Sequence, residues 1–176
     1  MSDSGPGNQV GIRVKGDNNV LSNNYISVRK DLADNYWTKT IGVRSFGNDC
    51  LIIGNTISDG SDGIFIEDAN SLVVSGNSIQ NCGVVAIHLK DSSHVTVEDN
   101  TLVDSKWGVL SSNATSLAIR IRDMKRDGIE LSNAASSSIS GNSINNCGDP
   151  AISLHDPSNI TVEKNTLLES RQGSIK

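Results

Sequence analysis

The chain has 176 residues, a formal net charge of −5, 36% apolar residues and only 3% aromatic residues, which fits one soluble, mildly acidic domain. It contains 26 Ser, 19 Asn and 16 Gly, all turn-favouring types, so extensive helix is excluded and many short strands joined by tight turns are expected. The branched apolar residues between these turns exclude a disordered chain.

The first residues and the cysteines indicate mainly what the chain lacks. Met1 to Gly7 have neither the basic nor the apolar segment of a secretion signal, so we expect either a cytoplasmic protein or removal of a leader, and the compartment stays open. No run of 18 apolar residues is present, so no membrane span is expected. Cys50, Cys82 and Cys147 lack C-x-x-C spacing, which argues against a zinc site or a disulfide framework and favours buried apolar positions.

A repeat of about 22 residues runs from Gly11 onward, and each unit has a small residue, an Ile-x-Val strand, a polar turn, a second strand and an Asn-x-Ile motif. The units begin at Gly11, Gly42, Gly63, Ala86, Gly108, Gly128, Ala151 and Gly173. So short a unit cannot bury its apolar side alone, so the units must stack as coils. We expect a lead-in at residues 1–10 and one domain over residues 11–176, with seven complete coils and the start of an eighth.

The first interval is longer because of an insertion at residues 31–40. It contains Tyr36 and Trp37, which would either wall a binding surface or shield the side of the stack.

Aligned units give columns of equivalent residues. One polar column consists of Asn24, Asn55, Asn77, Asn100, Asn142 and Asn165. Asn tolerates the left-handed backbone of a sharp bend, and stacked amides can hydrogen-bond between coils, so we expect this column to build a bend. In the fifth coil Arg122 stands where the column predicts Asn. Each unit also contributes apolar residues to columns that we expect to face the core. One such column, in the first strand of the units, contains Ile12, Val43 and Ile64.

These columns resemble the right-handed parallel β-helix repeats of the pectin-lyase-like superfamily. The resemblance rests on segments such as Gly63 to Ser71 and Ser75 to Ile79, and it covers nearly the whole chain. It implies an all-β, right-handed parallel β-helix of about seven to eight coils. A left-handed β-helix is the alternative, although its hexapeptide period is absent.

The superfamily includes pectate and alginate lyases, polygalacturonases, mannuronan epimerases, phage tailspikes and periplasmic proteins that accompany copper-enzyme maturation. The resemblance therefore implies a polysaccharide or oligosaccharide as the commonest partner, but it does not specify a reaction. No complete catalytic signature of these families is present, and a polysaccharide lyase or epimerase-like activity is left open.

In the enzymes of this superfamily the substrate usually lies over the exposed side of one sheet, so the outward residues of each first strand are candidates. Different chemical types converge there in the middle coils, namely Arg44, Phe46, Phe65, Glu67, His88, Lys90 and Asp91. This patch could bind an acidic polysaccharide, with Arg44 at the carboxylate and His88 or Lys90 as the catalytic proton acceptor. Alternatively, Glu67 and Lys90 form an ordinary cross-strand charge pair on a solvated sheet.

Two smaller features lead to further expectations. Asp68 and Asp91, one coil apart, would cap tight turns or hold a weak Ca²⁺, and no other cofactor or metal site is expected. A basic spot contains Arg120 and Arg122, which would bind an acidic substrate group unless Glu98 neutralises Arg120.

Asp62 and Asp127 both precede a glycine, but three coils separate them. They are therefore too far apart to act as a carboxylate pair.

The negative net charge and the lack of a basic stripe argue against a nucleic-acid partner. Uncovered strand edges at the ends of a rod favour self-association. Two functions stay open: a β-helix that binds and processes an acidic polysaccharide, or a non-catalytic structural or assembly module such as a fibre segment or a fragment of a larger β-helix protein.

Overall fold

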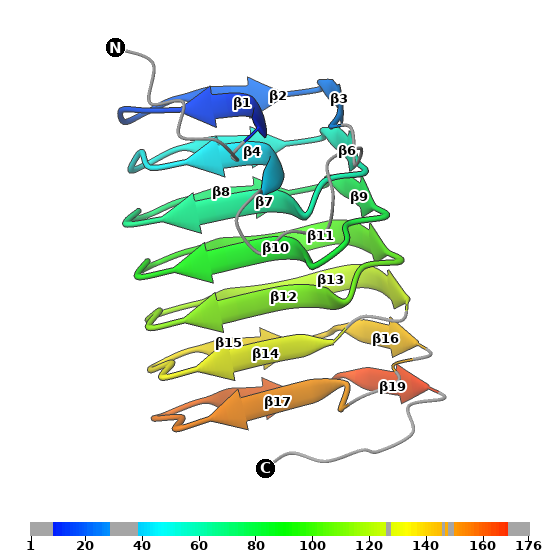
Figure 1. Cartoon of the computed structure of the whole chain (residues 1–176). Coiled ribbons are helices and arrows are strands. Elements are labelled where there is room, and N and C mark those ends of the chain that lie inside the picture. Colours follow the sequence, from blue (N-terminus) through cyan, green and yellow to red (C-terminus); the bar gives the residue numbers. More distant parts are fainter. Residues whose placement is uncertain (1–8, 29–38, 126–127, 146, 148–149, 169–176) are drawn as a thin grey trace.

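The computed structural model describes residues 9–28, 39–125, 128–145, 147 and 150–168, and for residues 122–125 it describes the backbone alone. Every helix or strand in these ranges is a strand, and the paired strands run parallel. The chain winds into stacked coils that form a right-handed parallel β-helix (Figure 1). This confirms the fold class expected from the sequence. Within the same ranges, no helix has the length and apolar character that crossing a membrane requires.

One side of the β-helix is a seven-stranded sheet with one strand from each coil, and we number the coils one to seven in that order (Figure 1). Its strands are β1 (Gln9–Val14), β4 (Thr40–Ser45), β7 (Asp62–Glu67), β10 (Val85–Lys90), β12 (Trp107–Ser112), β14 (Ile129–Ser132) and β17 (Ile152–His155). Because β1 begins at Gln9, the first coil extends into the expected lead-in. Tyr36, Trp37 and the eighth coil expected at Gly173 lie outside the described residues.

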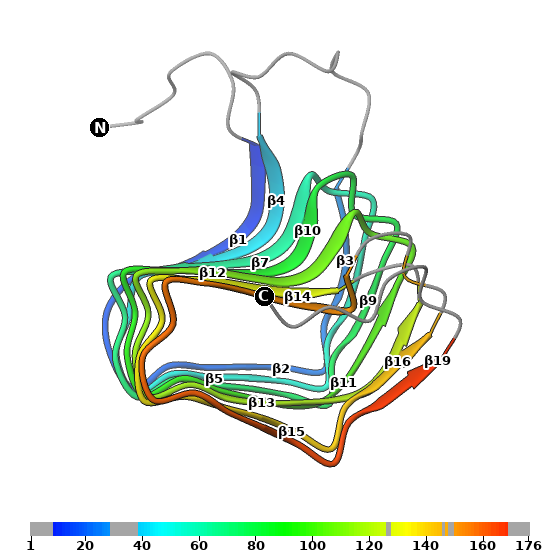
Figure 2. The same ribbon diagram turned by 90° about the horizontal axis from the view of Figure 1, so that it is seen from below.

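The other two sides belong to a twelve-stranded sheet. The second side consists of β2 (Val20–Ser22), β5 (Leu51–Ile53), β8 (Val73–Ser75), β11 (Thr96–Val103), β13 (Ala118–Lys125), β15 (Ser138–Ser140) and β18 (Thr161–Glu163). The third side is formed by the ends of β11 and β13 with β3 (Tyr25–Ser27), β6 (Thr56–Ser58), β9 (Ser78–Gln80), β16 (Ser143–Asn145) and β19 (Thr166–Leu168). Figure 2 shows the seven-stranded sheet opposite the second side, with the third side between them.

Apolar columns fill the interior, as predicted. Along the seven-stranded sheet the register aligns Ile12, Val43, Ile64, Ile87, Val109, Ile129 and Ile152. Ile64, Ile87 and Val109 have no exposed surface. Burying each such side chain contributes about 1.5–3 kcal/mol, so stacking supplies the stability that one coil lacks.

The expected asparagine column forms a hydrogen-bonded ladder, but its backbone differs from the expectation. Asn55 Nδ2 donates to Asn77 Oδ1 at 3.0 Å, and Asn77 Nδ2 donates to Asn100 Oδ1 at 2.9 Å. The left-handed backbone lies one residue earlier, at Gly54 (φ 65°) and Gly76 (φ 63°), rather than at the asparagines. Because the preceding residue makes the turn, the asparagine is free to bond along the stack.

The ladder is interrupted in coil five, and the prediction that Arg122 occupies the vacant position is wrong. Ile121 pairs with Asn100, and its backbone N donates to Asn142 Oδ1 at 2.6 Å. The strand register between β11 and β13 shifts on both sides of this pair. Asp99 of β11 therefore has no partner in β13, and Arg122 of β13 has no partner in β11.

Candidate functional site

The predicted patch lies on the outer side of the seven-stranded sheet, over coils two to four. The register places Arg44 beside Phe65 and Phe65 beside His88. In the next outward column Glu67 lies beside Lys90. Strand alternation therefore brings together the side chains that the sequence pattern selected.

Glu67 links the two cations of the patch. Its Oε2 accepts a hydrogen bond from Arg44 Nη2 at 2.9 Å, and its Oε1 accepts one from Lys90 Nζ at 2.7 Å. The hydrogen bond from Lys90 is the main cause that lowers the pKa of Glu67; burial opposes this shift and Arg44 adds to it. The same hydrogen bond raises the pKa of Lys90. The charge pair expected as the alternative to a binding role is therefore present, and Lys90 is held in its protonated form.

Both phenylalanines of the patch pack against its cations, and Phe65 is buried. The Arg44 guanidinium carbon lies 4.7 Å from the ring centre of Phe46 and 5.3 Å from that of Phe65. A second cation also lies near Phe65, since Lys39 Nζ is 5.7 Å from the centre of its ring. Because Phe65 is only 7% exposed, its face is not open for a sugar ring to stack on.

Asp62 is a site residue that the sequence analysis did not connect with the patch. Its side chain has no exposed surface, and its Oδ2 lies 3.5 Å from His88 Nδ1 and 3.4 Å from Lys39 Nζ. Its Oδ1 is buried with no hydrogen-bond partner among the described residues. A signal was available, because the register places Asp62 between the buried apolar residues Ile41 and Val85. A single carboxylate in an apolar column is a candidate for function.

Gly63 explains how Asp62 and Phe65 both reach His88. A Cβ at Gly63 would lie 2.5 Å from Ile79 Cγ2 and 2.6 Å from the backbone oxygen of Ala86, so the strand passes too close to the core for a side chain. The position of Gly63 therefore faces the core, and the next residue, Ile64, is also part of the buried core. The resulting irregularity changes the alternation of side chains, so Asp62 joins the outer face.

Asp91 has a defined role in the turn after β10. Its backbone is left-handed, with φ 48°, and the equivalent residues Asp68 and Asn113 both have φ 53°. Asn113 Nδ2 donates to Asp91 Oδ1 at 2.9 Å, and Lys90 Nζ lies 3.8 Å from Asp91 Oδ2. These contacts support a turn function, and Ca²⁺ binding at Asp68 and Asp91 stays a prediction.

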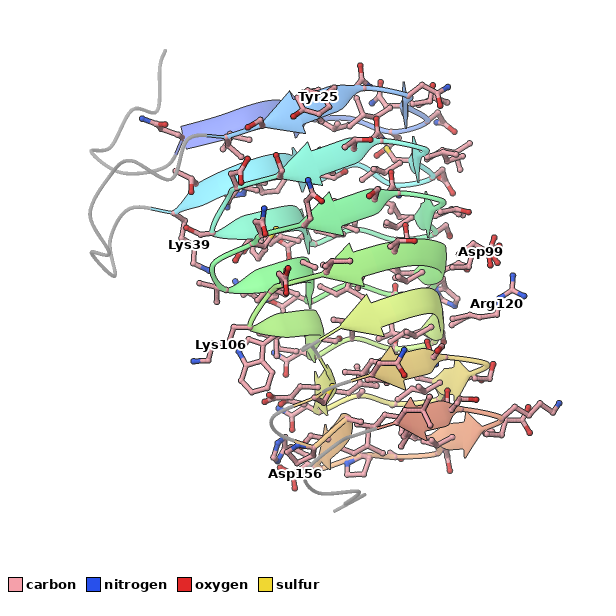
Figure 3. All side chains as sticks on the ribbon, turned by 90° about the vertical axis from the view of Figure 1, so that its right-hand side faces the viewer. Tyr25, Lys39, Asp99, Lys106, Arg120 and Asp156 are labelled. Carbon is pink, nitrogen blue, oxygen red and sulfur yellow. The ribbon has the colours of Figure 1, made fainter. Side chains whose placement is uncertain are left out.

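The basic spot of coil five lies away from the patch. Figure 3 shows Arg120 and Asp99 on the opposite side of the stack from Lys39. Arg120 Nη2 lies 3.2 Å from Asp99 Oδ2 and 3.5 Å from Glu98 Oε2, so acidic neighbours already pair with this cation. The side chain of Arg122 lies outside the described residues. Arg120 and the patch therefore do not form one binding surface.

The comparisons with known proteins place the chain among β-helix proteins. The family model described as "Periplasmic copper-binding protein (NosD)" matches residues 44–174. The crystal structure of an alginate lyase from Paenibacillus sp. str. FPU-7 aligns with a TM-score of 0.60 and 14% sequence identity, over 95% of this chain and 71% of that chain. This likeness concerns the fold alone. No curated protein matches the chain.

The described residues do not fit a copper centre. Copper favours thiolate, thioether and imidazole ligands. All three cysteines are buried, and the three histidines lie at residues 88, 94 and 155 on coils four and seven. Across the part of the chain that the structure describes, no three His, Cys, Asp or Glu residues gather closely enough to hold a metal ion.

Proposed function

The chain belongs to the family of the periplasmic copper-binding protein NosD, and we propose that its β-helix binds an acidic polysaccharide along the outer side of the seven-stranded sheet. The proposed surface, which we call the cationic face, consists of Arg13, Lys15, Lys39, Arg44, His88 and Lys90. It lies over coils one to four.

One observation carries the proposal: Arg13 and Arg44 are in-register neighbours on β1 and β4. Like charges on neighbouring strands destabilise a sheet. Arg44 is held by Glu67, but Arg13 is exposed and forms no ion pair with any residue in the described ranges. An anionic group bound beside Arg13 would relieve this repulsion through charge-assisted hydrogen bonds.

The charge of the outer column changes along the stack. Arg13 and Arg44 occupy it in coils one and two, Phe65 and His88 in coils three and four, and Leu110 and Glu130 in coils five and six. An acidic chain is therefore favoured over the first coils and disfavoured over the later ones. Lys39 and Lys90, with side chains 47% and 44% exposed, add cations that a polyanion can reach.

The face also presents groups that suit sugar hydroxyls. Glu67 and Asp91 supply acceptors, and Lys90 supplies donors beside them. Such mixed pairs bind hydroxyl groups without leaving a charge unpaired. Because the structural neighbour is named an alginate lyase, alginate is the first saccharide to test.

Self-association is a second candidate function, and a different observation favours it. Of the five large apolar side chains that are exposed in the described ranges, Val20 and Tyr25 lie on the first coil and Leu167 and Leu168 on the last. Tyr25 is 76% exposed and Leu168 is 54% exposed. Contact between coil ends would cover them and pair the free strand edges. Sedimentation over a range of protein concentrations tests this function.

Calorimetric titration tests saccharide binding. Alginate and polygalacturonate are the acidic ligands, and dextran is the neutral control. We expect binding of an acidic ligand that weakens as salt rises, because the contacts are exposed ion pairs. Arg13→Ala should weaken it, whereas Arg120→Ala, the same change on the opposite side, should not. Equal binding of dextran, or loss of binding only in Arg120→Ala, would overturn the proposal.

A further inference from the structure

The cationic face contains one imidazole set against a buried carboxylate, and saccharide binding alone gives this pair no role. We propose that Asp62 and His88 form a proton-accepting pair, in which Asp62 positions the imidazole and His88 Nε2 removes a proton from a bound uronate residue. The inference rests on the proposed function, because its substrate is the acidic saccharide that the face binds.

The geometry of the pair favours a reactive group over a structural one. Asp62 is completely buried, one of its oxygens has no hydrogen-bond partner in the described ranges, and the other lies 3.5 Å from His88 Nδ1. An incompletely satisfied buried carboxylate is destabilising, so an apolar residue there would serve the fold better. The His88 side chain is 15% exposed, so it remains in contact with solvent at the edge of a buried carboxylate.

Two side chains contact the imidazole, and a third balances the charge of one of them. The ring of Phe65 packs against that of His88 in a T-shaped contact, with ring centres 4.7 Å apart and planes at 70°. Asp62 Oδ2 lies 3.5 Å from Nδ1, and Lys39 Nζ, 3.4 Å from the same oxygen, supplies a balancing charge. An acceptor at Nδ1 selects the tautomer with hydrogen on Nδ1, which leaves the lone pair on Nε2. No hydrogen bond occupies Nε2 within the described ranges. Nε2 is therefore available to a ligand.

The other titratable groups of the face fit a proton acceptor less well. Lys90 is hydrogen-bonded to Glu67, which raises its pKa and keeps it protonated. Glu67 is held by two cations that lower its pKa, so it is a weak base. Lys90 therefore contributes positive charge to the reaction, and His88 is the better proton acceptor.

The proposed step is proton removal from the carbon next to a uronate carboxyl group. The C–H bond breaks, an N–H bond forms at Nε2, and the electron pair moves into the carboxylate. The intermediate has two balanced fates. The proton returns to the same carbon, or the bond to the neighbouring glycosidic oxygen breaks, the electron pair forms a carbon–carbon double bond, and the leaving oxygen takes the proton from Nε2. Neither fate needs another reactant.

The first test reads the tautomer in the protein without ligand. Long-range ¹H–¹⁵N NMR at a pH where free imidazole is neutral shows which nitrogen bears hydrogen. We expect hydrogen on Nδ1 of His88 in the wild type and a shift towards Nε2 in Asp62→Val, a substitution that matches the apolar neighbours in its column. Hydrogen on Nε2 in the wild type, or no change in the variant, would overturn the positioning role.

The second test reads the reaction. The protein is incubated with alginate or polygalacturonate in D₂O, and NMR records deuterium entering the uronate while ultraviolet absorbance records unsaturated products. We expect one of these signals in the wild type. His88→Gln should reduce its rate at least about 100-fold, and Asp62→Val about 10- to 100-fold in kcat with little change in KM. His155→Gln, a histidine three coils away, is the matched control and should leave the rate unchanged.

The outcomes separate this inference from the proposed function. Binding of the saccharide without deuterium uptake or unsaturated product would overturn the reaction and leave the binding function standing. No binding of any acidic saccharide would overturn both. Turnover that survives in His88→Gln would assign the reaction to another group.

Discussion

Asn77 Nδ2 donates a hydrogen bond to Asn100 Oδ1 at 2.9 Å, and both side chains are buried in the stack. The Oδ1 of Asn77 accepts two further bonds from Asn55, one from its backbone N and one from its Nδ2. One side chain therefore joins three consecutive coils.

Asn77→Leu should lower the free energy of unfolding by about 2–4 kcal/mol, because it leaves buried donors and acceptors on two neighbouring coils unpaired. Asn100→Leu should act in the same direction. Denaturant midpoints measure the effect, and Gln80→Leu, an exposed change on the same side of the coil, is the control. Wild-type midpoints for both ladder variants would mean that the ladder does not stabilise the stack.

Glu67→Gln should destabilise the protein at neutral pH and do so less as the pH falls. Because the folded state lowers the pKa of Glu67, its stabilising effect is complete above the ordinary glutamate pKa and is lost as the pH falls through the lower folded value. Urea unfolding of both proteins across the acid range measures the difference. A difference that stays constant down to the most acidic pH would contradict this linkage.

Gly63→Ala should destabilise the fold by about 1–3 kcal/mol, because the added Cβ has no room between coils. The nearest atoms, at 2.5 Å and 2.6 Å, include backbone that cannot rotate away. The variant should also slow the proposed proton transfer, since the position of Asp62 beside His88 depends on this strand irregularity. Thermal unfolding checks the first effect, and an unchanged Tm would show that the strand can move outward at no cost.

Copper should not bind tightly to this chain. Its cysteines are buried, and in the described ranges no three His, Cys, Asp or Glu side chains gather closely enough to hold a metal ion. Titration with Cu(I) and Cu(II) in the presence of a competing chelator measures the affinity. One copper ion held per chain against the chelator, and lost in His88→Gln, would contradict the expectation.

The fold was predictable because, in a stack of repeats, residues one repeat apart in the sequence become neighbours on adjacent coils. Ile64 and Ile87 are one repeat apart and prove to be in-register neighbours, and the same holds for Glu67 and Lys90. The spacing of residues did not predict coil five correctly. Two compensating register shifts around Ile121 leave the repeat length almost unchanged, but they place Ile121 instead of Arg122 beside Asn100.

The candidate site was only partly predictable. Outward columns identified His88 and Arg44, but strict alternation assigns Asp62 to the inside of the sheet. The irregularity at Gly63 reverses that assignment, and it follows from a close contact with Ile79 on another side of the coil. Long-range packing of this kind leaves no periodic signal. For the same reason the sequence could not show that Phe65 is covered by the cations beside it.

Mapping a bound saccharide on the protein tests the central claim most directly. An acidic oligosaccharide, first an alginate fragment, is titrated into ¹⁵N-labelled protein, and chemical shifts are recorded for every backbone amide. The account predicts shifts at Arg13, Arg44 and His88 that saturate together, with none at Arg120 or Leu168. Shifts confined to Arg120, or to the terminal coils around Tyr25 and Leu168, would contradict it.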